Sequence, residues 1–364
     1  MLLIFNSAMR YIMWKYVRHY LLNTLTFRKI PYSSQIELTL KCNAKCKFCA
    51  IPGIPESLKK KEMTTNQVKN VINQIADLGI LSLTFTGGEP TLRKDLPELI
   101  YHSGIVHKLI TGLASNGLNL PKLLENDKLK GLNYILLSLD YPIAELHDKM
   151  RGIKVFDKVL KTISLANKKG IKVIISANIM KKNLKYMVDL CELARNLNCC
   201  IELYPCEDIV RKYNGEKYKI DNIDSIIPNL HLWAKMVRYL KKKYKNLLTD
   251  RYSIKTIENG GFGGNPKYQK FIRCRVAEAY LFVRHDGFID YPCKINPIKR
   301  FNALEKPIYS IYNSKEAREI MKQHDNYDFC DGCRLGCSIT ASLLKDRRTI
   351  YEKYVKNFFR GNLK

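Results

Sequence analysis

The sequence predicts an α/β protein, a partial (β/α)6 barrel followed by a small cysteine-rich domain. Three observations lead to this prediction. Strand-like and helix-like segments alternate between residues 36 and 206. Glycine, asparagine and acidic residues stand where several of these strands end. Short-spaced cysteines occur in two places, one just after the first strand and one near the end of the 364-residue chain.

The spacing of apolar residues places the elements in order. Short β-rich runs predict strands, and an apolar face with a 3.6-residue repeat predicts a helix. Strands are expected at 36–40, 81–86, 108–114, 134–139, 172–177 and 201–204, and helices at 66–78, 156–169 and 184–196. Repeated β-then-α units imply a parallel sheet with helices outside it. In such a barrel, active-site residues sit at the carboxyl ends of the strands.

Composition divides the chain into five expected segments. Residues 1–35 are a basic amphipathic segment, 36–206 the barrel, and 207–270 a basic helical insert or linker. Residues 271–340 form the cysteine-rich domain, and 341–364 a basic amphipathic tail.

The charge balance limits the classes of partner. The chain has 62 Lys and Arg against 34 Asp and Glu, a net charge of +28, which favours an anionic partner such as nucleic acid or an anionic membrane surface. At 46% hydrophobic residues, the composition excludes a disordered chain. No run of 18 apolar residues is free of charge, so no spanning helix is expected. The segment at 1–30 is either an interfacial membrane helix or a helix packed on the domain.

The first cysteine group carries the sharpest chemical information. Cys42, Cys46 and Cys49 stand in a Cys-x3-Cys-x2-Cys spacing after the first expected strand. Three thiolates on one loop can hold three irons of a [4Fe–4S] cluster and leave the fourth iron open to a small molecule. Zinc sites usually pair Cys-x2-Cys with further ligands nearby, which this loop does not offer. A large chain with short-spaced cysteines also indicates a reducing compartment rather than a disulfide framework.

This loop resembles that of the radical S-adenosylmethionine (SAM) superfamily, in which an aromatic residue precedes the last cysteine, as Phe48 does here. The resemblance covers about 36–206 and extends to Gly87-Gly88-Glu89-Pro90, which is similar to the family's GGE motif. It implies that this motif contacts the amino group of SAM. The other positions that resemble SAM-binding sites are Ser115, Asn116, Ser138, Asp140, Arg151 and Asn178, with Arg151 expected on the SAM carboxylate. For these rim residues, an ordinary polar barrel edge is the alternative.

The resemblance implies an enzyme that cleaves SAM reductively, so that a 5′-deoxyadenosyl radical abstracts hydrogen from an unactivated carbon. It also implies an external electron donor of the flavodoxin or ferredoxin type. Cys206 follows the sixth expected strand and is a weaker catalytic candidate. An iron–sulfur scaffold or redox sensor is the non-enzymatic alternative.

The second cysteine group supplies enough thiolates for another cluster. Cys274, Cys293, Cys330 and Cys333 are four ligands, and Cys337 is an alternative one. The run before Cys293 resembles the auxiliary-cluster extension called SPASM, or its shorter form, twitch. Here Gly287 precedes Cys293 by one residue more than usual, and the tail has five cysteines where a full SPASM set has seven. One auxiliary [4Fe–4S] cluster is therefore expected, with a structural zinc site as the alternative.

The substrate is the least determined part. Basic amphipathic segments at both termini and at 231–248 favour a membrane lipid hydrocarbon or isoprenoid chain, with the enzyme cytoplasmic and peripherally membrane-associated. A peptide or protein is the alternative, because SPASM-type extensions usually accompany peptide substrates. RNA is a third candidate that the charge permits, although no RNA-binding module is visible. The oligomeric state is left open.

Overall fold

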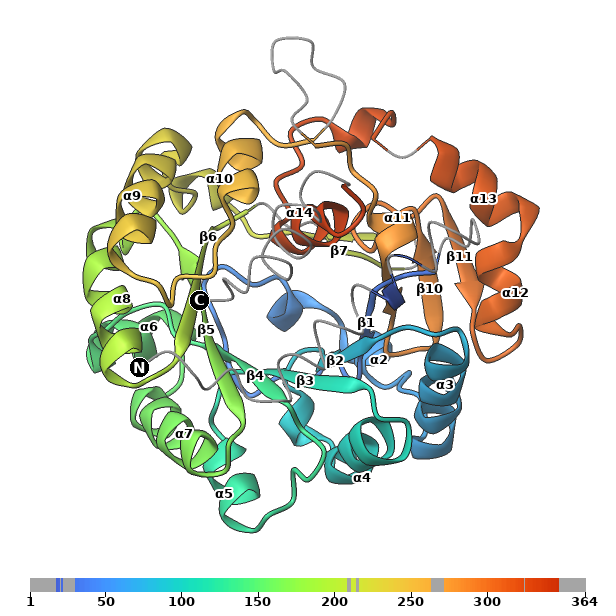
Figure 1. Cartoon of the computed structure of the whole chain (residues 1–364), viewed down its shortest axis with the longest axis horizontal. Coiled ribbons are helices and arrows are strands. Elements are labelled where there is room, and N and C mark those ends of the chain that lie inside the picture. The colour runs from blue at the N-terminus through green and yellow to red at the C-terminus, as the bar shows by residue number, and fades with distance from the viewer. Residues whose placement is uncertain are drawn as a thin grey trace.

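In the computed structural model, strands form the centre of the molecule and helices surround them (Figure 1). The structure describes residues 18, 19, 21, 30–207, 211–213, 216–262, 272–323 and 325–346. Within these residues, nine strands form one sheet in the order β11-β10-β9-β1-β2-β3-β4-β5-β6. The predicted α/β class with a parallel barrel sheet is therefore confirmed.

The first six strands follow one another in both sequence and space, and every neighbouring pair is parallel. They are β1 (Ser33–Glu37), β2 (Ser82–Thr86), β3 (Ile110–Ser115), β4 (Tyr134–Ser138), β5 (Lys172–Ile179) and β6 (Cys200–Pro205). The helices between them are α2 (Glu56–Lys59), α3 (Thr65–Asp77), α4 (Leu96–Tyr101), α5 (Leu120–Glu125), α6 (Ala144–Arg151), α7 (Phe156–Lys168) and α8 (Met187–Asn196). A π-helical turn at His102–Val106 follows α4.

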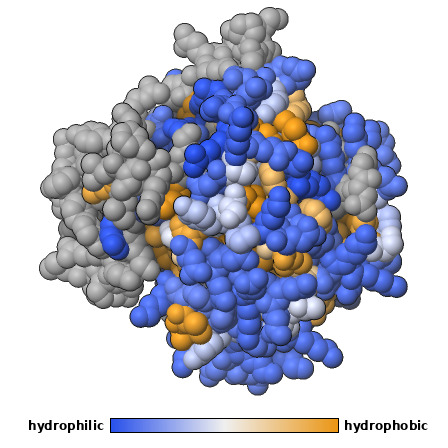
Figure 2. All heavy atoms as spheres, turned by 90° about the vertical axis from the view of Figure 1, so that its right-hand side faces the viewer, coloured by the Kyte–Doolittle hydropathy of each residue, from blue (hydrophilic) through white to orange (hydrophobic). Residues whose placement is uncertain are grey.

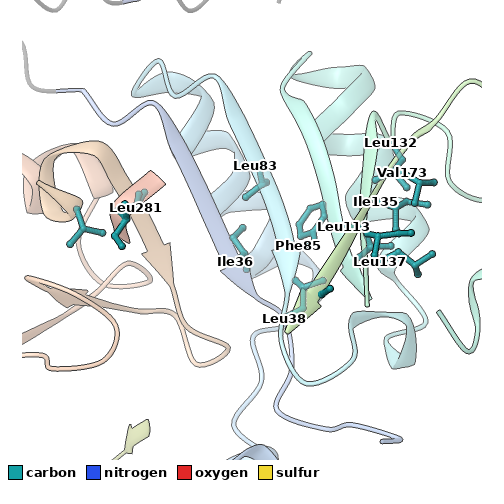
Figure 3. Close-up of a cluster of buried hydrophobic side chains, with 14 of the residues drawn as sticks. Ile36, Leu38, Leu83, Phe85, Leu113, Leu132, Ile135, Leu137, Val173 and Leu281 are labelled. Atoms are coloured by element: carbon teal, nitrogen blue, oxygen red, sulfur yellow. The ribbon is translucent and has the colours of Figure 1, made fainter. Parts of the chain in front are cut away.

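The three barrel helices that the sequence predicts, α3, α7 and α8, each bury an apolar face. In α3, Val68, Val71, Ile72 and Ile75 are buried, and Thr64 and Gln67 form a capping box that fixes its first turn. The strands meet these helices with alternating side chains, of which Ile36, Leu83 and Phe85 lie on neighbouring strands in Figure 3. The main core therefore sits between the sheet and the helices, and leaves the strand ends free to carry polar groups.

The first strand begins and ends earlier than its sequence predicts. It was expected at 36–40 and lies at Ser33–Glu37. Beyond Glu37 the chain bends toward the cysteine loop, where Leu40 packs with Ile51 and Ile54 in a separate small core. Leu40 is apolar because of this second core, whereas Leu38 is buried in the main core just beyond the end of the strand.

The chain later returns to the same sheet on the other side of β1. Strand β9 (Tyr280–Val283) pairs in parallel with β1, and β10 (Phe288–Tyr291) and β11 (Lys299–Asn302) follow as antiparallel strands. The remaining helices here are α11 (Val276–Ala279), α12 (Ile308–Asn313), α13 (Lys315–Lys322) and α14 (Gly336–Leu343). The face toward the right of Figure 1 is mostly hydrophilic (Figure 2). The five-segment division stays a prediction, and one sheet includes residues of three of its segments, 1–35, 36–206 and 271–340.

The middle of the chain contains a hairpin and two helices. The hairpin consists of β7 (Arg211–Tyr213) and β8 (Glu216–Tyr218), and the helices are α9 (Leu230–Lys243) and α10 (Arg251–Glu258). Helix α9 buries Trp233, Val237 and Leu240 against the barrel, so the apolar side of the expected basic helix packs inside the protein. Most of the basic terminal segments lies outside the described residues. Among the described residues, no helix has the length and apolarity to cross a membrane.

One buried asparagine joins the ends of β4 and β5. The Nδ2 of Asn183 donates to the carbonyls of Asp140 (2.8 Å) and Asn178 (2.9 Å), and its Oδ1 accepts from the backbone N–H of Met180. Asn183 is fully buried, so these backbone groups depend on it for their hydrogen bonds.

Asn183→Ala should therefore lower the free energy of unfolding by about 3 kcal/mol, because buried polar groups lose their partners. The measurement is chemical denaturation followed by circular dichroism. Asn126→Ala is the matched control, since Asn126 is exposed and makes a single bond to the Lys122 carbonyl. Equal midpoints for both variants would contradict the role of Asn183.

Candidate active site

Backbone hydrogen bonds hold the first cysteine loop in place. It follows β1, and its residues Lys45 and Lys47 donate from their backbone N–H groups to the carbonyls of Arg151 (3.0 Å) and Met150 (3.2 Å) at the end of α6. Within the loop, Cys49 N–H donates to the Cys46 carbonyl (3.1 Å). The loop is thereby fixed to an element about 100 residues away in sequence.

The Gly-Gly-Glu segment after β2 lies against the start of this loop. The N–H of Gly88 donates to the Thr39 carbonyl (2.7 Å), and that of Glu89 donates to the Lys41 carbonyl (2.9 Å). A Cβ at Gly88 would stand 2.2 Å from the Lys41 oxygen, and one at Gly87 2.3 Å from the Thr39 oxygen. Both glycines are therefore required for close approach of two backbone segments. Pro90 begins the short 3₁₀ turn that follows.

Glu89 is fully buried at the centre of a hydrogen-bond network. Its carboxylate accepts from the Ser115 hydroxyl (2.8 Å) and the Asn116 N–H (2.8 Å), as well as from the N–H and hydroxyl of Thr91. The Asn116 side chain then donates to Asn43 Oδ1 (2.7 Å) in the cysteine loop. Burial raises the pKa of Glu89, and these hydrogen bonds oppose that shift. The ends of β2 and β3 and the cysteine loop are thus joined.

An ion pair joins β4 to α6 beside the same loop. Arg151 Nε lies 2.7 Å from Asp140 Oδ2, and both side chains are nearly or fully buried. The guanidinium also lies 3.8 Å from Cys46 Sγ and 5.1 Å from the centre of the Phe48 ring. Burial opposes the charge of Arg151, but Asp140 and Cys46 raise its pKa above the ordinary value. Arg151 was expected to bind the SAM carboxylate, and here it contacts Asp140 and a candidate iron ligand.

The remaining rim candidates lie at the ends of β4, β5 and β6. The backbone N–H of Asn178 donates to Asp140 Oδ1 (2.9 Å), and Ser138 is half-buried as the last residue of β4. Cys206 is buried in an apolar cluster with Tyr141, Met180 and Ile223. Burial raises the pKa of its thiol to about 11, which disfavours the thiolate that a nucleophile needs. All of these roles stay predictions.

The chemistry of the first cysteine group fits an iron–sulfur cluster. Burial, together with the neighbouring charges of Glu89, Cys46 and Cys49, raises the pKa of Cys42 to about 11. Burial also raises the pKa of Cys46, while Arg151 lowers it. Three thiols close enough to influence one another, beside a fixed cation, form a donor set that iron can deprotonate on binding.

The second cysteine group lines a cavity of about 230 Å³ between the end of β6 and the C-terminal part of the chain. Cys274, Cys293, Cys330 and Cys333 all face this cavity. Burial raises the pKa of Cys333 to about 12 and that of Cys274 well above its usual value, with further contributions from neighbouring thiols. Four mutually influencing thiols fit the ligand set of one cluster.

Cys337 lies in an adjoining cavity that shares Cys293 with the first. Its charge contributes to the raised pKa values of Cys293 and Cys333, so it is close enough to remain the alternative ligand. In the part of the chain that the structure describes, no three His, Cys, Asp or Glu side chains converge on a single metal ion.

Several residues of the site were not predicted from the sequence. Asn43, Thr91 and Asn183 make the hydrogen bonds described above. Glu207 lines the cavity that contains Cys274, Cys293, Cys330 and Cys333. Burial raises the pKa of Glu207 to about 8, and the charge of Arg334 lowers it. Its place directly after β6 follows the strand-end rule that selected Cys206. No motif or spacing in the sequence marked the polar residues inside the first cysteine loop as part of the site.

His147 is a buried titratable group next to the backbone of Asp140, the acidic member of the ion pair with Arg151. Its Nδ1 accepts from the Asp140 backbone N–H (3.2 Å), and burial lowers its pKa from 6.5 to about 4. A depressed histidine pKa means that the folded state favours the neutral ring. This contribution to stability is complete above about pH 6.5 and is lost as the pH falls toward 4.

Lowering the pH from 6.5 to 4 should therefore cost up to about 3 kcal/mol through His147, at about 1.4 kcal/mol per pKa unit. His147→Asn keeps an acceptor but cannot titrate, so its unfolding free energy should change less over this range. His231→Asn serves as the control, because His231 is largely exposed. Parallel pH profiles for the parent protein and His147→Asn would contradict the assignment.

Comparisons with known proteins now give the site its context. The profile of the radical SAM superfamily matches residues 36–194, and that of the SPASM iron–sulfur cluster-binding domain matches residues 274–334. The AdoMet-dependent heme synthase of Methanosarcina barkeri is 26% identical over 82% of this chain and 89% of that protein. The PqqA peptide cyclase of Bradyrhizobium diazoefficiens is 29% identical, but the match spans 46% of this chain and 44% of that protein.

The fold also resembles that of solved structures. SuiB of Streptococcus suis, in its complex with the precursor peptide SuiA, aligns with a TM-score of 0.62 and 18% identity over 92% of this chain and 76% of that one. The resemblance at this identity concerns the fold. The two profile matches show that this chain is an enzyme with a radical SAM domain and, in its C-terminal region, a SPASM domain.

Proposed function

We propose that this enzyme modifies a peptide or protein substrate by radical SAM chemistry. The observation that carries the proposal is the placement of the second cysteine group. Glu207, directly after β6, lines the same cavity as Cys274, Cys293, Cys330 and Cys333. The SPASM site therefore adjoins the edge of the barrel at which the first cysteine loop and the Glu89 network also stand.

The cofactors of this family are SAM and a [4Fe–4S] cluster, and the SPASM domain adds auxiliary iron–sulfur binding. When bound and supplied with an electron, they provide the cleavage of SAM that leads to hydrogen abstraction. In this proposal Cys42, Cys46 and Cys49 hold the first cluster, and the Gly88–Glu89 segment and Asn116 face SAM. Arg151, held by Asp140, orients Cys46 and balances its negative charge.

A peptide substrate has better support than the membrane lipid that the basic segments suggested. The PqqA peptide cyclase match covers 46% of this chain, and the SPASM profile matches residues 274–334. The apolar face of α9, which the lipid interpretation used, is buried in the protein. The only remaining support for peripheral membrane association or RNA modification is the net positive charge of the chain.

A tetrapyrrole is the second candidate substrate. The heme synthase match covers 82% of this chain, whereas the peptide cyclase match covers 46%. In this alternative, the protein would act on a tetrapyrrole rather than on a peptide.

The two cysteine groups can be tested separately. Cys46→Ala should abolish formation of 5′-deoxyadenosine, because the first cluster loses a ligand. Cys333→Ala should keep the first cluster but lower total iron by about four per chain, the content of one [4Fe–4S] cluster. The measurements are iron and sulfide counting and product analysis after anaerobic reconstitution.

Cys191→Ala is the matched control, since Cys191 is buried in the main core away from both groups. It should keep its iron and its product. Unchanged SAM cleavage in Cys46→Ala would overturn the assignment of the first cluster, and unchanged iron in Cys333→Ala would overturn that of the second.

The substrate class can be read from the hydrogen that is abstracted. Peptide, porphyrin and lipid fractions are prepared from cells grown on deuterated medium and are offered separately to the reconstituted enzyme. Mass spectrometry then measures deuterium in 5′-deoxyadenosine. Deuterium from the peptide fraction alone supports the proposal. Transfer from the porphyrin or lipid fraction alone would replace it with that substrate class.

A further inference from the structure

Two histidines beyond the end of α4 share one side-chain oxygen on α3. The Nε2 atoms of His102 and His107 each lie 2.7 Å from Asn73 Oδ1, and the two ring centres are 4.8 Å apart. All three side chains are half-buried, so solvent reaches them. Two imidazole nitrogens and one amide oxygen therefore converge on one place at the surface, away from both cysteine groups.

The π-helical turn brings the two histidines together. His107 N–H donates to the His102 carbonyl (3.1 Å), the five-residue spacing of a π turn. In an α-helix, residues five apart point in directions that differ by about 140° around the axis. The wider turn lets both rings reach Asn73 on α3, which packs beside α4 (Figure 1). Such turns are rare and frequently occur at functional sites.

The backbone of this turn is held firmly against the barrel. A Cβ at Gly104 would stand 2.1 Å from the Gly131 oxygen, so these two backbone segments touch. The buried Ser103 hydroxyl lies 2.7 Å from the Thr111 hydroxyl of β3, and the Ser103 carbonyl accepts from Leu109 N–H (3.1 Å). Side chains on a backbone fixed in this way are preorganised for a ligand.

A carboxylate lies one helical turn before His102. Glu98 pairs with Lys69, and these two residues precede His102 and Asn73 by four positions each, so they form the neighbouring contact between α4 and α3. This pairing agrees with the finding that, within the described residues, no three His, Cys, Asp or Glu side chains converge on a metal ion. Because an ion pair this exposed is weak, Glu98 can exchange Lys69 for a cation at little cost.

We propose that His102, His107 and Asn73 bind one divalent transition-metal ion of the zinc class, with Glu98 or water completing the coordination. Two imidazoles favour such an ion over Mg²⁺ or Ca²⁺, whose usual ligands are oxygen atoms. Zinc–ligand distances of about 2.0–2.1 Å place tetrahedral ligand atoms about 3.3 Å apart, so each nitrogen moves by about half an ångström from Asn73. Half-buried rings allow a movement of this size.

The location of the site indicates a structural ion. His107 lies shortly before β3 begins, whereas the first cysteine loop follows the end of β1. In barrels of this kind, the amino-terminal ends of the strands serve stability rather than catalysis. An ion held here joins α3 to the turn after α4, and it stabilises the folded protein because the unfolded chain lacks the site. The proposal depends neither on the iron–sulfur clusters nor on the substrate.

The test titrates Zn²⁺ into the full-length reconstituted protein, in which iron and sulfide occupy the cysteine groups. The parent protein should bind about one Zn²⁺ per chain at this site and should unfold at a higher temperature with Zn²⁺ than without it. His102→Gln and His107→Gln keep a side-chain donor for Asn73 but remove one imidazole. Each should lose this binding and the shift in unfolding temperature.

His231→Gln is the matched control, because His231 is exposed and also lies beside a carboxylate, 3.3 Å from Glu258. It should bind Zn²⁺ as the parent does. Equal binding by the parent, His102→Gln and His107→Gln would place the ion elsewhere and overturn the proposal. An equal loss in His231→Gln would show non-specific binding and overturn it too.

A spectroscopic measurement identifies the ligands. Cu²⁺ held by nitrilotriacetate keeps positions for two imidazoles, and the nitrogen couplings in its electron paramagnetic resonance spectrum report them. The parent should show two imidazole nitrogens and His107→Gln at most one. The same spectrum from both proteins would contradict the site.

A gain of affinity excludes damage to the fold as the explanation. Asn73→Asp puts a carboxylate in place of the amide between the two histidines, which gives the set that zinc prefers. This variant should bind Zn²⁺ more tightly than the parent, by about tenfold or more, since a charged oxygen replaces a neutral one. Unchanged or weaker binding would remove Asn73 from the ligand set and overturn the proposed site.

Discussion

The buried ion pair between Asp140 and Arg151 is the interaction on which the arrangement of the first site depends. Asp140 is fixed by the backbone N–H of Asn178, and Arg151 reaches from it to the Cys46 thiol and the Phe48 ring. The carbonyl of Arg151 also accepts a hydrogen bond from the cysteine loop. Removing one partner of such a buried pair typically costs about 3–5 kcal/mol, because the other charge remains without compensation. This one ion pair thus links the ends of β4 and β5, helix α6 and the first cysteine loop.

A second set of contacts holds the opposite side of the loop. Gly87 and Gly88 allow the end of β2 to approach the chain after β1 at distances that no side chain permits. The Glu89 carboxylate accepts a hydrogen bond from the backbone N–H of Asn116, directly after β3. The Asn116 side chain in turn donates to Asn43 in the first cysteine loop. The loop is consequently held between two rigid supports, which is the kind of preorganisation that a cofactor site needs.

The SPASM part is physically joined to the barrel. Strand β9 pairs with β1, whose end leads into the first cysteine loop. The turn after β9 is also attached to the segment that follows the loop: His285 Nε2 lies 3.1 Å from the Leu58 carbonyl, and the N–H of Met63 donates to the carbonyl of His285 (2.8 Å). These contacts join the strand pair that precedes Cys293 to the segment that follows the first cysteine loop.

The sequence by itself determined the class of fold, the six parallel strands and the residue types of both cysteine groups, since period, turn residues and cysteine spacing are local properties. It also singled out Glu89, Asp140 and Arg151 as candidate site residues, and their roles stay predictions. Only the tertiary structure decided that Arg151 pairs with Asp140 beside Cys46, that β9 joins β1, and that the first cysteine loop is hydrogen-bonded to the end of α6. These features depend on backbone segments that meet across long stretches of sequence, and no local pattern records such a meeting. The early end of β1 has the same cause, because Leu40 is apolar for a core that exists only once the cysteine loop has folded.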